Sequence, residues 1–239
     1  MKNIAVIFAG GVGKRMQNAS KPKQFLELNG KPVIIYTLEI FENHPEIDGI
    51  VVVCLEGWIP YLEKQMEKFG IRKVGAVVPG GQTGMESIYH GLKATLECYG
   101  CDCHVLIHDG VRPLITAKTV TDNIRAVEEF GTCVTCVHAT ETILVNRAEG
   151  EIEIPSRADT LIARAPQSFR LADILKVHEQ AREEGRNDFI DSCTMMSHYG
   201  YVIHTVIGPV ENIKITTPTD FFIFRAVAEA YENQQIFGY

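Results

Sequence analysis

Short apolar runs alternate along this chain with longer stretches in which apolar residues return every three or four positions. Continuous short runs are typical of strands buried on both faces, and the longer period is typical of helices packed on one face. The pattern predicts strands at residues 4–8, 49–55, 73–78, 103–108, 133–137, 161–165 and 202–207. It predicts helices at residues 32–41, 59–69, 85–96, 119–130, 171–184, 191–198 and from Thr217 to about 231. Strands separated by helices in this way indicate βαβ units and a mostly parallel sheet.

The regular alternation breaks after residue 137. Residues 141–145 and 151–154 are short β-like runs joined by a turn that contains Glu149 and Gly150. They predict a hairpin arm at about residues 138–160. We find no internal repeat, low-complexity segment or linker, so we expect one domain over residues 1–239. The expected fold class is α/β: a single-domain, Rossmann-like, mostly parallel sheet with helices on both faces and a protruding β-hairpin arm.

Composition and charge narrow the class of protein. Hydrophobic residues make up 46% of the 239 residues and charged residues 22%, which is enough apolar material for a large core. The formal net charge of −7 is the opposite of what a nucleic-acid-binding domain usually carries. The apolar run near the N-terminus is too short for a secretory signal, and no stretch approaches the ~20 apolar residues of a membrane span. We therefore expect a cytoplasmic protein without nucleic-acid or membrane partners, and the odd number of cysteines, seven, fits a reducing compartment.

The first candidate for chemistry is the sequence AGGVGKRM at residues 9–16, directly after the first predicted strand. Glycines allow backbone N–H groups to approach a phosphate closely. Two familiar phosphate loops are excluded, because Arg15 stands where a Walker motif needs Ser or Thr and Met16 where a dinucleotide fingerprint needs Gly. Residues 1–26 carry basic side chains and no acidic one, as a triphosphate site would require. A tight strand–helix turn with a solvated basic loop is the alternative.

Three further segments are predicted at the same edge of the sheet. Asp109, in HDGVRP at residues 108–113, could hold Mg²⁺ or a ribose hydroxyl, or could cap a turn. PGGQ at residues 79–82 is a second glycine turn, and NIKITTP at residues 212–218 brings a late lysine before the last helix. Ligands of open α/β sheets bind at the carboxyl ends of the strands, so these loops together predict a composite nucleotide site.

Two Cys-x-x-Cys pairs, at residues 98–101 and 133–136, match a four-cysteine zinc pattern formally. The gap between the pairs is longer than usual, and the second pair lies in a predicted strand, where positions three apart point to opposite faces. We therefore expect free thiols rather than a zinc site.

Five motifs in this order and spacing resemble one family: AGGVGKRM, PKQFL at residues 22–26, HDGVRP, APQSF at residues 165–169, and NIKITTP. The chain is similar to the small CTP-dependent cytidylyltransferases that act on polyol phosphates, from residue 9 to residue 220. The resemblance implies a nucleotidyltransferase-type fold. It also implies transfer of CMP from CTP to a polyol phosphate with release of pyrophosphate.

The resemblance also implies roles for individual residues. The glycine-loop residues that would wrap the CTP phosphates are Ala9, Gly10, Gly11 and Gly13. The residues that match the family's catalytic cations at the phosphates are Arg15, Lys23 and Lys214. Those placed where the family recognises cytosine and ribose are Gly81, Gln82 and Ser87, with an acid or similar polar residue usual at the position of Gln82.

Asp109 matches the aspartate near ribose and Mg²⁺, so we expect Mg²⁺ or another divalent cation as cofactor. Arg157 matches an arginine on the arm that, in the family, reaches the polyol phosphate bound by the partner subunit, which implies a homodimer through the arm. We also expect Arg112 and Asp191 beside the substrate, although Asp191 could equally cap a helix.

The identity of the polyol divides the family into branches. The sequences AGG at residues 9–11 and IPSR at residues 154–157, with Ile190, look more like members that use D-ribitol 5-phosphate. Members that use 2-C-methyl-D-erythritol 4-phosphate, the alternative substrate, more often have a second alanine in the segment that corresponds to residues 9–11. They also often have a threonine at the position of Ile190. Ala165 stands where threonine is frequent and Gly84 where a basic residue is common, so a third alditol phosphate remains open as the acceptor.

A CDP-ribitol product would imply teichoic acid or capsule synthesis, and the methylerythritol product would imply isoprenoid synthesis. A catalytically silent nucleotide-binding module is the non-enzymatic alternative, and pyrophosphate release distinguishes it.

Overall fold

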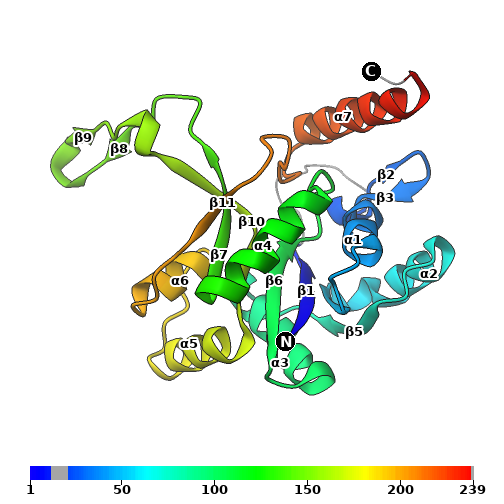
Figure 1. The fold of residues 1–239 in the computed structure, drawn as a ribbon, viewed down its shortest axis with the longest axis horizontal. Coiled ribbons are helices and arrows are strands. Elements are labelled where there is room, and N and C mark those ends of the chain that lie inside the picture. The colour runs from blue at the N-terminus through cyan, green and yellow to red at the C-terminus, as the bar shows by residue number, and fades with distance from the viewer. Residues whose placement is uncertain (12–20, 238–239) are drawn as a thin grey trace.

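A computed structural model describes residues 1–11 and 21–237 of the chain. At its centre lies a seven-stranded sheet in the order β11-β7-β10-β6-β1-β4-β5 (Figure 1). The strands are β1 (Lys2–Ala9), β4 (Gly49–Cys54), β5 (Val74–Pro79), β6 (Cys103–Asp109), β7 (Thr132–His138), β10 (Leu161–Arg170) and β11 (Thr205–Ile207). Within this sheet only β10 runs antiparallel to both of its neighbours. The predicted mostly parallel α/β sheet is therefore confirmed.

Most strand boundaries in this sheet lie within two residues of the sequence prediction, and two differ by more. The strand predicted at residues 161–165 continues to Arg170, because residues 167–170 pair with β6. The strand predicted at residues 202–207 begins only at Thr205, where pairing with β7 starts.

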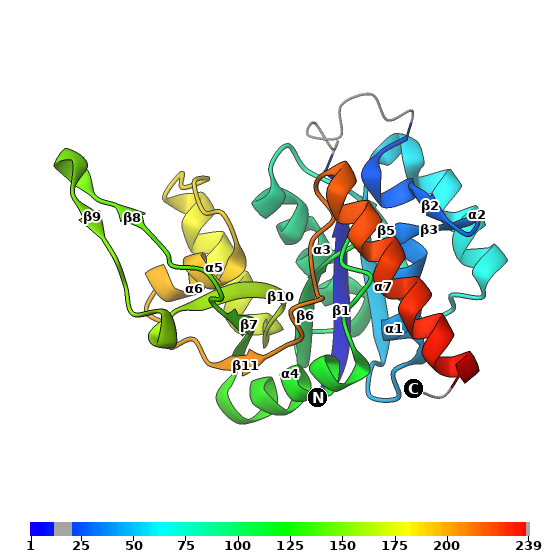
Figure 2. The ribbon, with the colours of Figure 1, turned by 90° about the horizontal axis from the view of Figure 1, so that it is seen from above.

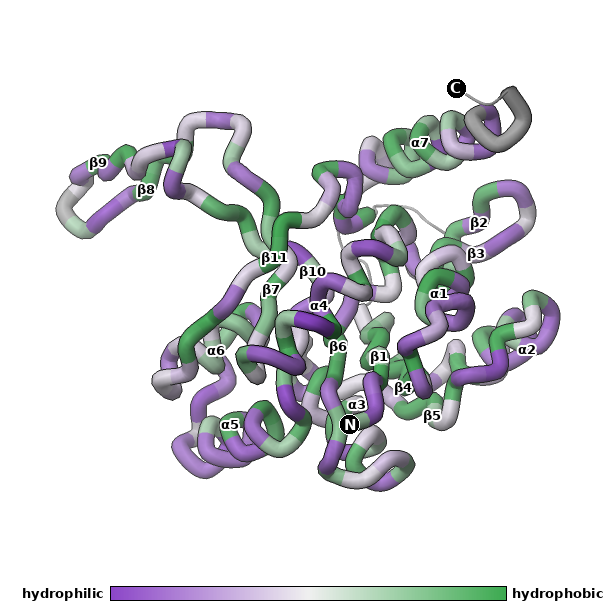
Figure 3. The backbone as a smooth tube through the Cα atoms, in the orientation of Figure 1, coloured by the Kyte–Doolittle hydropathy of each residue, from purple (hydrophilic) through white to green (hydrophobic). Residues whose placement is uncertain are grey.

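Helices cover both faces of the sheet. On one face lie α3 (Gly84–Tyr99), α5 (Leu171–Glu183) and α6 (Ser192–His198), and on the other lie α1 (Val33–Asn43), α2 (Ile59–Phe69) and α4 (Ala117–Phe130). Successive residues of β1 divide between the two cores: Ile4 and Val6 face α3, whereas Ala5 and Ile7 face α1. A strand buried on both faces is apolar at nearly every position, which explains the continuous apolar run, and β1 is accordingly mostly hydrophobic in Figure 3. Among the described helices, none is both long enough and apolar enough to cross a membrane.

The last helix, α7 (Pro218–Phe237), packs on α1 through a third apolar cluster that includes Phe224. Its start is a reciprocal cap. The Thr217 hydroxyl accepts a hydrogen bond from the Asp220 amide at 3.3 Å, and the Asp220 carboxylate accepts one from the Thr217 amide at 2.7 Å. The segment that carries Lys214 is held beside the end of β6 by a hydrogen bond from the Ile215 amide to the Val111 carbonyl at 2.9 Å.

Several shorter elements complete the fold. They are the 3-10 turns η1 (Lys23–Phe25), η2 (Glu56–Trp58), η3 (Ala148–Gly150) and η4 (Arg157–Asp159), and the antiparallel pair β2 (Glu27–Leu28) with β3 (Lys31–Pro32). Pro32 is extended and precedes α1, so that helix starts one residue later than predicted.

The predicted hairpin arm is present between β7 and β10. Its strands β8 (Val145–Asn146) and β9 (Ile152–Glu153) pair antiparallel. Figure 2 shows the arm projecting away from the body of the molecule. Three of its apolar side chains are more than half exposed, namely Leu144, Ile152 and Ile154.

Candidate active site

The carboxyl ends of four parallel strands meet at one edge of the sheet. β1 pairs with β6 on one side and with β4 on the other, and β5 continues beyond β4. The chain therefore reverses its direction of growth across the sheet beside β1, and such a switch point opens a ligand crevice in α/β folds. At this point Phe8 of β1 lies opposite Asp109 of β6.

The two glycine turns that the sequence predicted at this edge are in contact. A Cβ atom built on Gly10 would lie 3.6 Å from the Cα of Gly80 and 3.3 Å from the Ser87 hydroxyl oxygen, so the backbones approach closely. Ser87 is buried, accepts a hydrogen bond from the Gly81 amide at 3.0 Å and donates one to the Thr83 carbonyl at 2.9 Å. Its hydroxyl therefore holds the second turn in shape.

Gln24, in the PKQFL motif, holds the first turn. Its buried side-chain amide donates to the Ala9 carbonyl at 2.6 Å and to the Gly11 carbonyl at 3.3 Å. The neighbouring Lys23 lies in η1 and is partly buried. The predicted site residues Gly13 and Arg15 lie outside the described residues.

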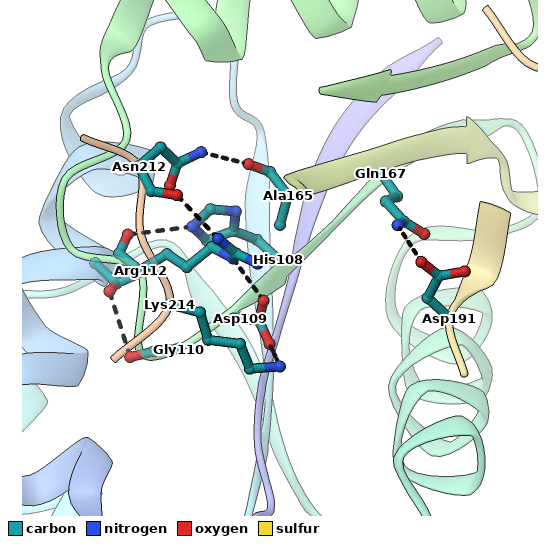
Figure 4. A network of polar contacts seen from close by, with 10 residues as sticks. His108, Asp109, Gly110, Arg112, Ala165, Gln167, Asp191, Asn212 and Lys214 are labelled. Atoms are coloured by element: carbon teal, nitrogen blue, oxygen red, sulfur yellow. Dashed lines mark hydrogen bonds and ion pairs between the residues drawn. The ribbon is translucent and has the colours of Figure 1, made fainter. Parts of the chain in front are cut away.

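Asp109 is the electrostatic centre of the edge. One carboxylate oxygen accepts from the Arg112 guanidinium at 2.7 Å and the other from the Lys214 ammonium at 2.6 Å (Figure 4). Burial alone would raise the pKa of Asp109, but the charges and hydrogen bonds of Arg112 and Lys214 outweigh it and lower the pKa to about 2. The structure thus brings Asp109, Arg112 and Lys214 together, as the sequence predicted.

His108 precedes Asp109 in the sequence and contacts the backbone of Arg112. The ring is fully buried, and its Nε2 lies 3.3 Å from the Arg112 carbonyl oxygen. Burial lowers its pKa to about 4, so the imidazole is neutral near pH 7. His108 therefore positions the loop that carries Arg112 rather than supplying charge.

A cavity of about 290 Å³ opens beside the Asp109 cluster. Asp109, Arg112 and Lys214 form one side of it, and Gln167, Asp191 and Ile190 form another. Asp191 caps α6 by accepting from the Thr194 amide at 2.9 Å, and it also accepts from the Gln167 side chain at 3.1 Å. Burial alone would raise its pKa, but these hydrogen bonds lower it. Of the two roles left open for Asp191, the structure shows the helix cap, and it leaves the residue at the cavity wall.

Several predicted site residues do not line this cavity, and Gln82 and Arg157 are two of them. Gln82 donates its backbone amide to the Glu86 carboxylate and lines a second cavity, of about 370 Å³, between α3 and α5. Arg157 lies in η4 at the base of the arm and is exposed, with one Nη at 3.5 Å from the Thr140 carbonyl oxygen.

Four residues near the site did not enter the sequence-based set. Gln24, Gln167 and Asn212 each lie in a recognised motif, and a polar residue inside a motif was the available sequence signal. The structure shows that all three side chains are buried. Asn212 donates to the Ala165 carbonyl at 2.7 Å, and its own carbonyl accepts from Arg112 at 2.9 Å. Arg164 belongs to none of the motifs. The only signal for it was a charged residue inside a predicted strand.

Comparison with known proteins places these features in context. A family model described as IspD, 2-C-methyl-D-erythritol 4-phosphate cytidylyltransferase, matches residues 3–233. A ribitol-5-phosphate cytidylyltransferase from Vibrio parahaemolyticus is 54% identical over 237 residues, which cover 99% of this chain and 100% of the relative. A 2-C-methyl-D-erythritol 4-phosphate cytidylyltransferase from Clostridium botulinum is 37% identical over 230 residues, 95% of this chain and 98% of the relative. The crystal structure of 4-diphosphocytidyl-2C-methyl-D-erythritol synthase from Anaerococcus prevotii shares the fold, with a TM-score of 0.82 at 24% identity over 95% of this chain and 96% of that one.

Proposed function

The chain belongs to the IspD family of cytidylyltransferases, and from this premise we propose that it transfers CMP from CTP to D-ribitol 5-phosphate, yielding CDP-ribitol and pyrophosphate. The similarity to the ribitol-5-phosphate enzyme, 54% identity against 37% for the methylerythritol-phosphate enzyme, supports this choice of acceptor. The observation that carries the proposal is the cation-lined cavity beside Asp109, next to the two glycine turns.

The chemistry needs little from a general base. The attacking group is a phosphate monoester, which is already largely dianionic near pH 7 because its second pKa is ~6. An oxygen of this phosphate forms a bond to the α-phosphorus of CTP. The bond from that phosphorus to the bridging oxygen breaks, and pyrophosphate leaves with the electron pair. The barrier is dominated by repulsion between anions, so fixed cations and N–H groups provide most of the catalysis.

The residues of this chain have corresponding roles in the proposal. The glycine turn at Gly10 presents backbone N–H groups to the triphosphate. The turn at Gly80 packs against it and shapes this side of the site, because its own amides donate within the protein, Gly80 to the Cys54 carbonyl and Gly81 to the Ser87 hydroxyl. Lys214 and Lys23 stabilise charge that develops at the α-phosphorus, together with Arg15, which lies outside the described residues. Arg112 is held in place by Asp109 and by the Asn212 carbonyl, so its orientation is set before substrate binds.

Mg²⁺ is the proposed cofactor, and Asp109 its proposed protein ligand. Mg²⁺ binds through one or two carboxylates and the phosphates of the substrate while keeping several waters, so one ionised aspartate fits an ion carried by CTP. The side chain of Lys214 is 40% exposed, which gives it room to move from Asp109 toward phosphate. When bound, the ion would neutralise phosphate charge. Within the described part of the chain, no group of three or more His, Cys, Asp or Glu side chains could hold a metal.

A homodimer through the arm is part of the proposal. The hairpin exposes Leu144, Ile152 and Ile154, and a second copy would bury this apolar surface. Arg157, at the base of the arm, would then act on the site of the partner subunit. Light scattering after size exclusion should give about twice the 26.6 kDa of the chain. The variant Ile152→Asp should shift the protein toward the monomer and lower turnover, and a monomeric wild type would contradict this part.

The decisive experiment measures pyrophosphate release with CTP and Mg²⁺, side by side for D-ribitol 5-phosphate and 2-C-methyl-D-erythritol 4-phosphate. We expect a higher kcat/KM with D-ribitol 5-phosphate and no release without an acceptor. A preference for the methylerythritol substrate would overturn the choice of acceptor and keep the reaction. No release with either would overturn the proposal.

A further inference from the structure

Arg164 lies in the part of β10 where the regular pairing with the neighbouring strands is interrupted. The pairing of β10 with β6 stops at Gln167 opposite Ile107, and its register with β7 shifts between Ala163 and Gln167. The residues between are therefore a bulge beside the end of β6. Bulges of this kind re-aim side chains and are common next to active sites.

The bulge is nevertheless held in one place. The Asn212 side chain donates to the Ala165 carbonyl at 2.7 Å, and Asn212 is itself buried. The same residue accepts from Arg112 through its backbone carbonyl at 2.9 Å. Asn212 therefore ties the strand segment that carries Arg164 to the loop that carries Arg112 (Figure 4).

Arg164 lines the 290 Å³ cavity together with Arg112 and Lys214. Those two residues already occupy both carboxylate oxygens of Asp109. The other carboxylate at the wall, Asp191, accepts from Gln167 and Thr194. Among the described residues, no carboxylate lies within ion-pair distance of Arg164, so none of them neutralises its charge.

The environment of Arg164 makes this charge costly. Its Nε is buried and has no hydrogen-bond partner in the described structure. Burial and the nearby charge of Arg112 both lower the pKa of Arg164, although a guanidinium stays protonated at any physiological pH. A buried cationic donor without a nearby anion raises the free energy of the folded protein. Binding of an anion in the cavity is therefore favourable.

We propose that Arg164 binds the phosphate group of the acceptor substrate. This inference rests on the proposed function, because the acceptor is the ligand that must bring a phosphate to the α-phosphorus beside Lys214. A guanidinium presents parallel N–H groups that match two phosphate oxygens, and such charge-assisted pairs are stronger than neutral hydrogen bonds. The phosphate end of the acceptor then lies among Arg164, Arg112 and Lys214, and its hydroxyl chain extends toward Gln167 and Asp191.

The remaining wall of the cavity supports this orientation. Ala165 offers only a methyl group as a side chain, and Ile190 is apolar and 88% exposed. Neither side chain can hydrogen-bond a phosphate. Ser192 also lines the cavity, and its buried hydroxyl, which has no hydrogen-bond partner in the described structure, could donate to a phosphate oxygen. The charged contacts to that group have to come from the cations.

The test compares Arg164→Met with Arg170→Met. Arg170 lies on the same strand, is exposed and lines neither cavity, so it is a matched control. We expect Arg164→Met to raise the KM for D-ribitol 5-phosphate by about 10- to 100-fold, the loss typical of a charged hydrogen bond. The KM for CTP should change less than about twofold, and Arg170→Met should leave both constants unchanged. Arg164→Lys, which keeps the charge and loses the fork, should be intermediate.

The results separate the possible roles of Arg164. Equal increases in the KM for CTP and for the acceptor, or an unchanged acceptor KM, would overturn the proposal. If wild type prefers the methylerythritol phosphate, the same comparison is made with that acceptor.

If wild type uses neither acceptor, the proposed function fails and Arg164 is tested by binding alone. Inorganic phosphate should raise the melting temperature of wild type and Arg170→Met and have a smaller effect on Arg164→Met. An equal rise in all three proteins would overturn the assignment of Arg164.

Discussion

The two halves of the central sheet build the site in different ways. In the parallel half (β1, β4, β5 and β6), which we assign to the nucleotide, turns directly after the strands place backbone groups and Asp109 at the edge. In the half formed by β10, β7 and β11, which we assign to the acceptor, the site comes from a bulge and from residues distant in sequence, such as Arg164, Asp191 and Asn212. Local turns thus define one half of the site, and long-range contacts define the other.

Removing the charge of Asp109 should have the largest effect, because this residue joins both halves. Asp109→Asn leaves the buried Arg112 without its anion, and breaking a buried pair costs about 3–5 kcal/mol of unfolding free energy. Turnover should fall by roughly 10²–10³-fold, as when one electrostatic group of an active site is lost. Urea unfolding and kcat measure both effects. Asp122→Asn, in the exposed pair with Lys118, is the control and should change stability by less than about 1 kcal/mol.

Lys23→Ala should affect only the nucleotide half. We expect kcat to fall by about 10²-fold or more through lost transition-state stabilisation, with the melting temperature little changed. Lys21→Ala is the neighbouring control, since Lys21 pairs with Glu27 in a partly exposed salt bridge. Full activity of Lys23→Ala would contradict the role of this lysine.

Acid should destabilise both halves through buried histidines. Burial lowers the pKa of His108, in β6, and of His178, in α5, to about 4 in each case. The unfolded chain takes up these protons below pH ~6.5 and the folded chain only near pH 4, so stability falls as the pH drops between these values. Each histidine should cost roughly 2–3 kcal/mol by pH 4.5.

Urea unfolding between pH 7 and 4.5 tests this expectation. His178→Gln should show a flatter pH dependence of the unfolding free energy than wild type, and an unchanged slope would contradict the expectation.

The low pKa of Asp109 has a separate consequence for stability at acid pH. This carboxylate stabilises the fold above its unfolded pKa near 3.8, and its contribution is lost only as the pH falls from there toward 2.

Asn212→Ala should have the smallest effect and should be confined to the acceptor half. It removes the bond to the Ala165 carbonyl, which leaves the bulge without its anchor. We expect a loss of about 1–3 kcal/mol in stability and a rise of about tenfold in the acceptor KM. The KM for CTP should stay nearly constant, and a matching rise in both constants would show that the two halves are not separable.

The parallel half was largely predictable. β4 and β6 form within a residue of their predicted bounds, and the turns after β1 and β5 meet as expected. These features depend on a continuous apolar run followed by glycine, which local sequence reports directly. In the acceptor half, β11 is shorter than predicted and β10 longer, because both are defined by pairing with distant strands.

The sequence by itself determined the fold class, the cytidylyltransferase family and most of the charged groups at the edge of the sheet. Hydrophobic period and motif spacing are properties of consecutive residues, so they can be read without coordinates. Only the tertiary structure decided that both oxygens of Asp109 are paired and that Asp191 caps a helix. It also decided that Arg164 lines the acceptor cavity and that its buried Nε has no hydrogen-bond partner among the described residues. These facts depend on which groups are left without partners once the chain has folded, and no local pattern records that.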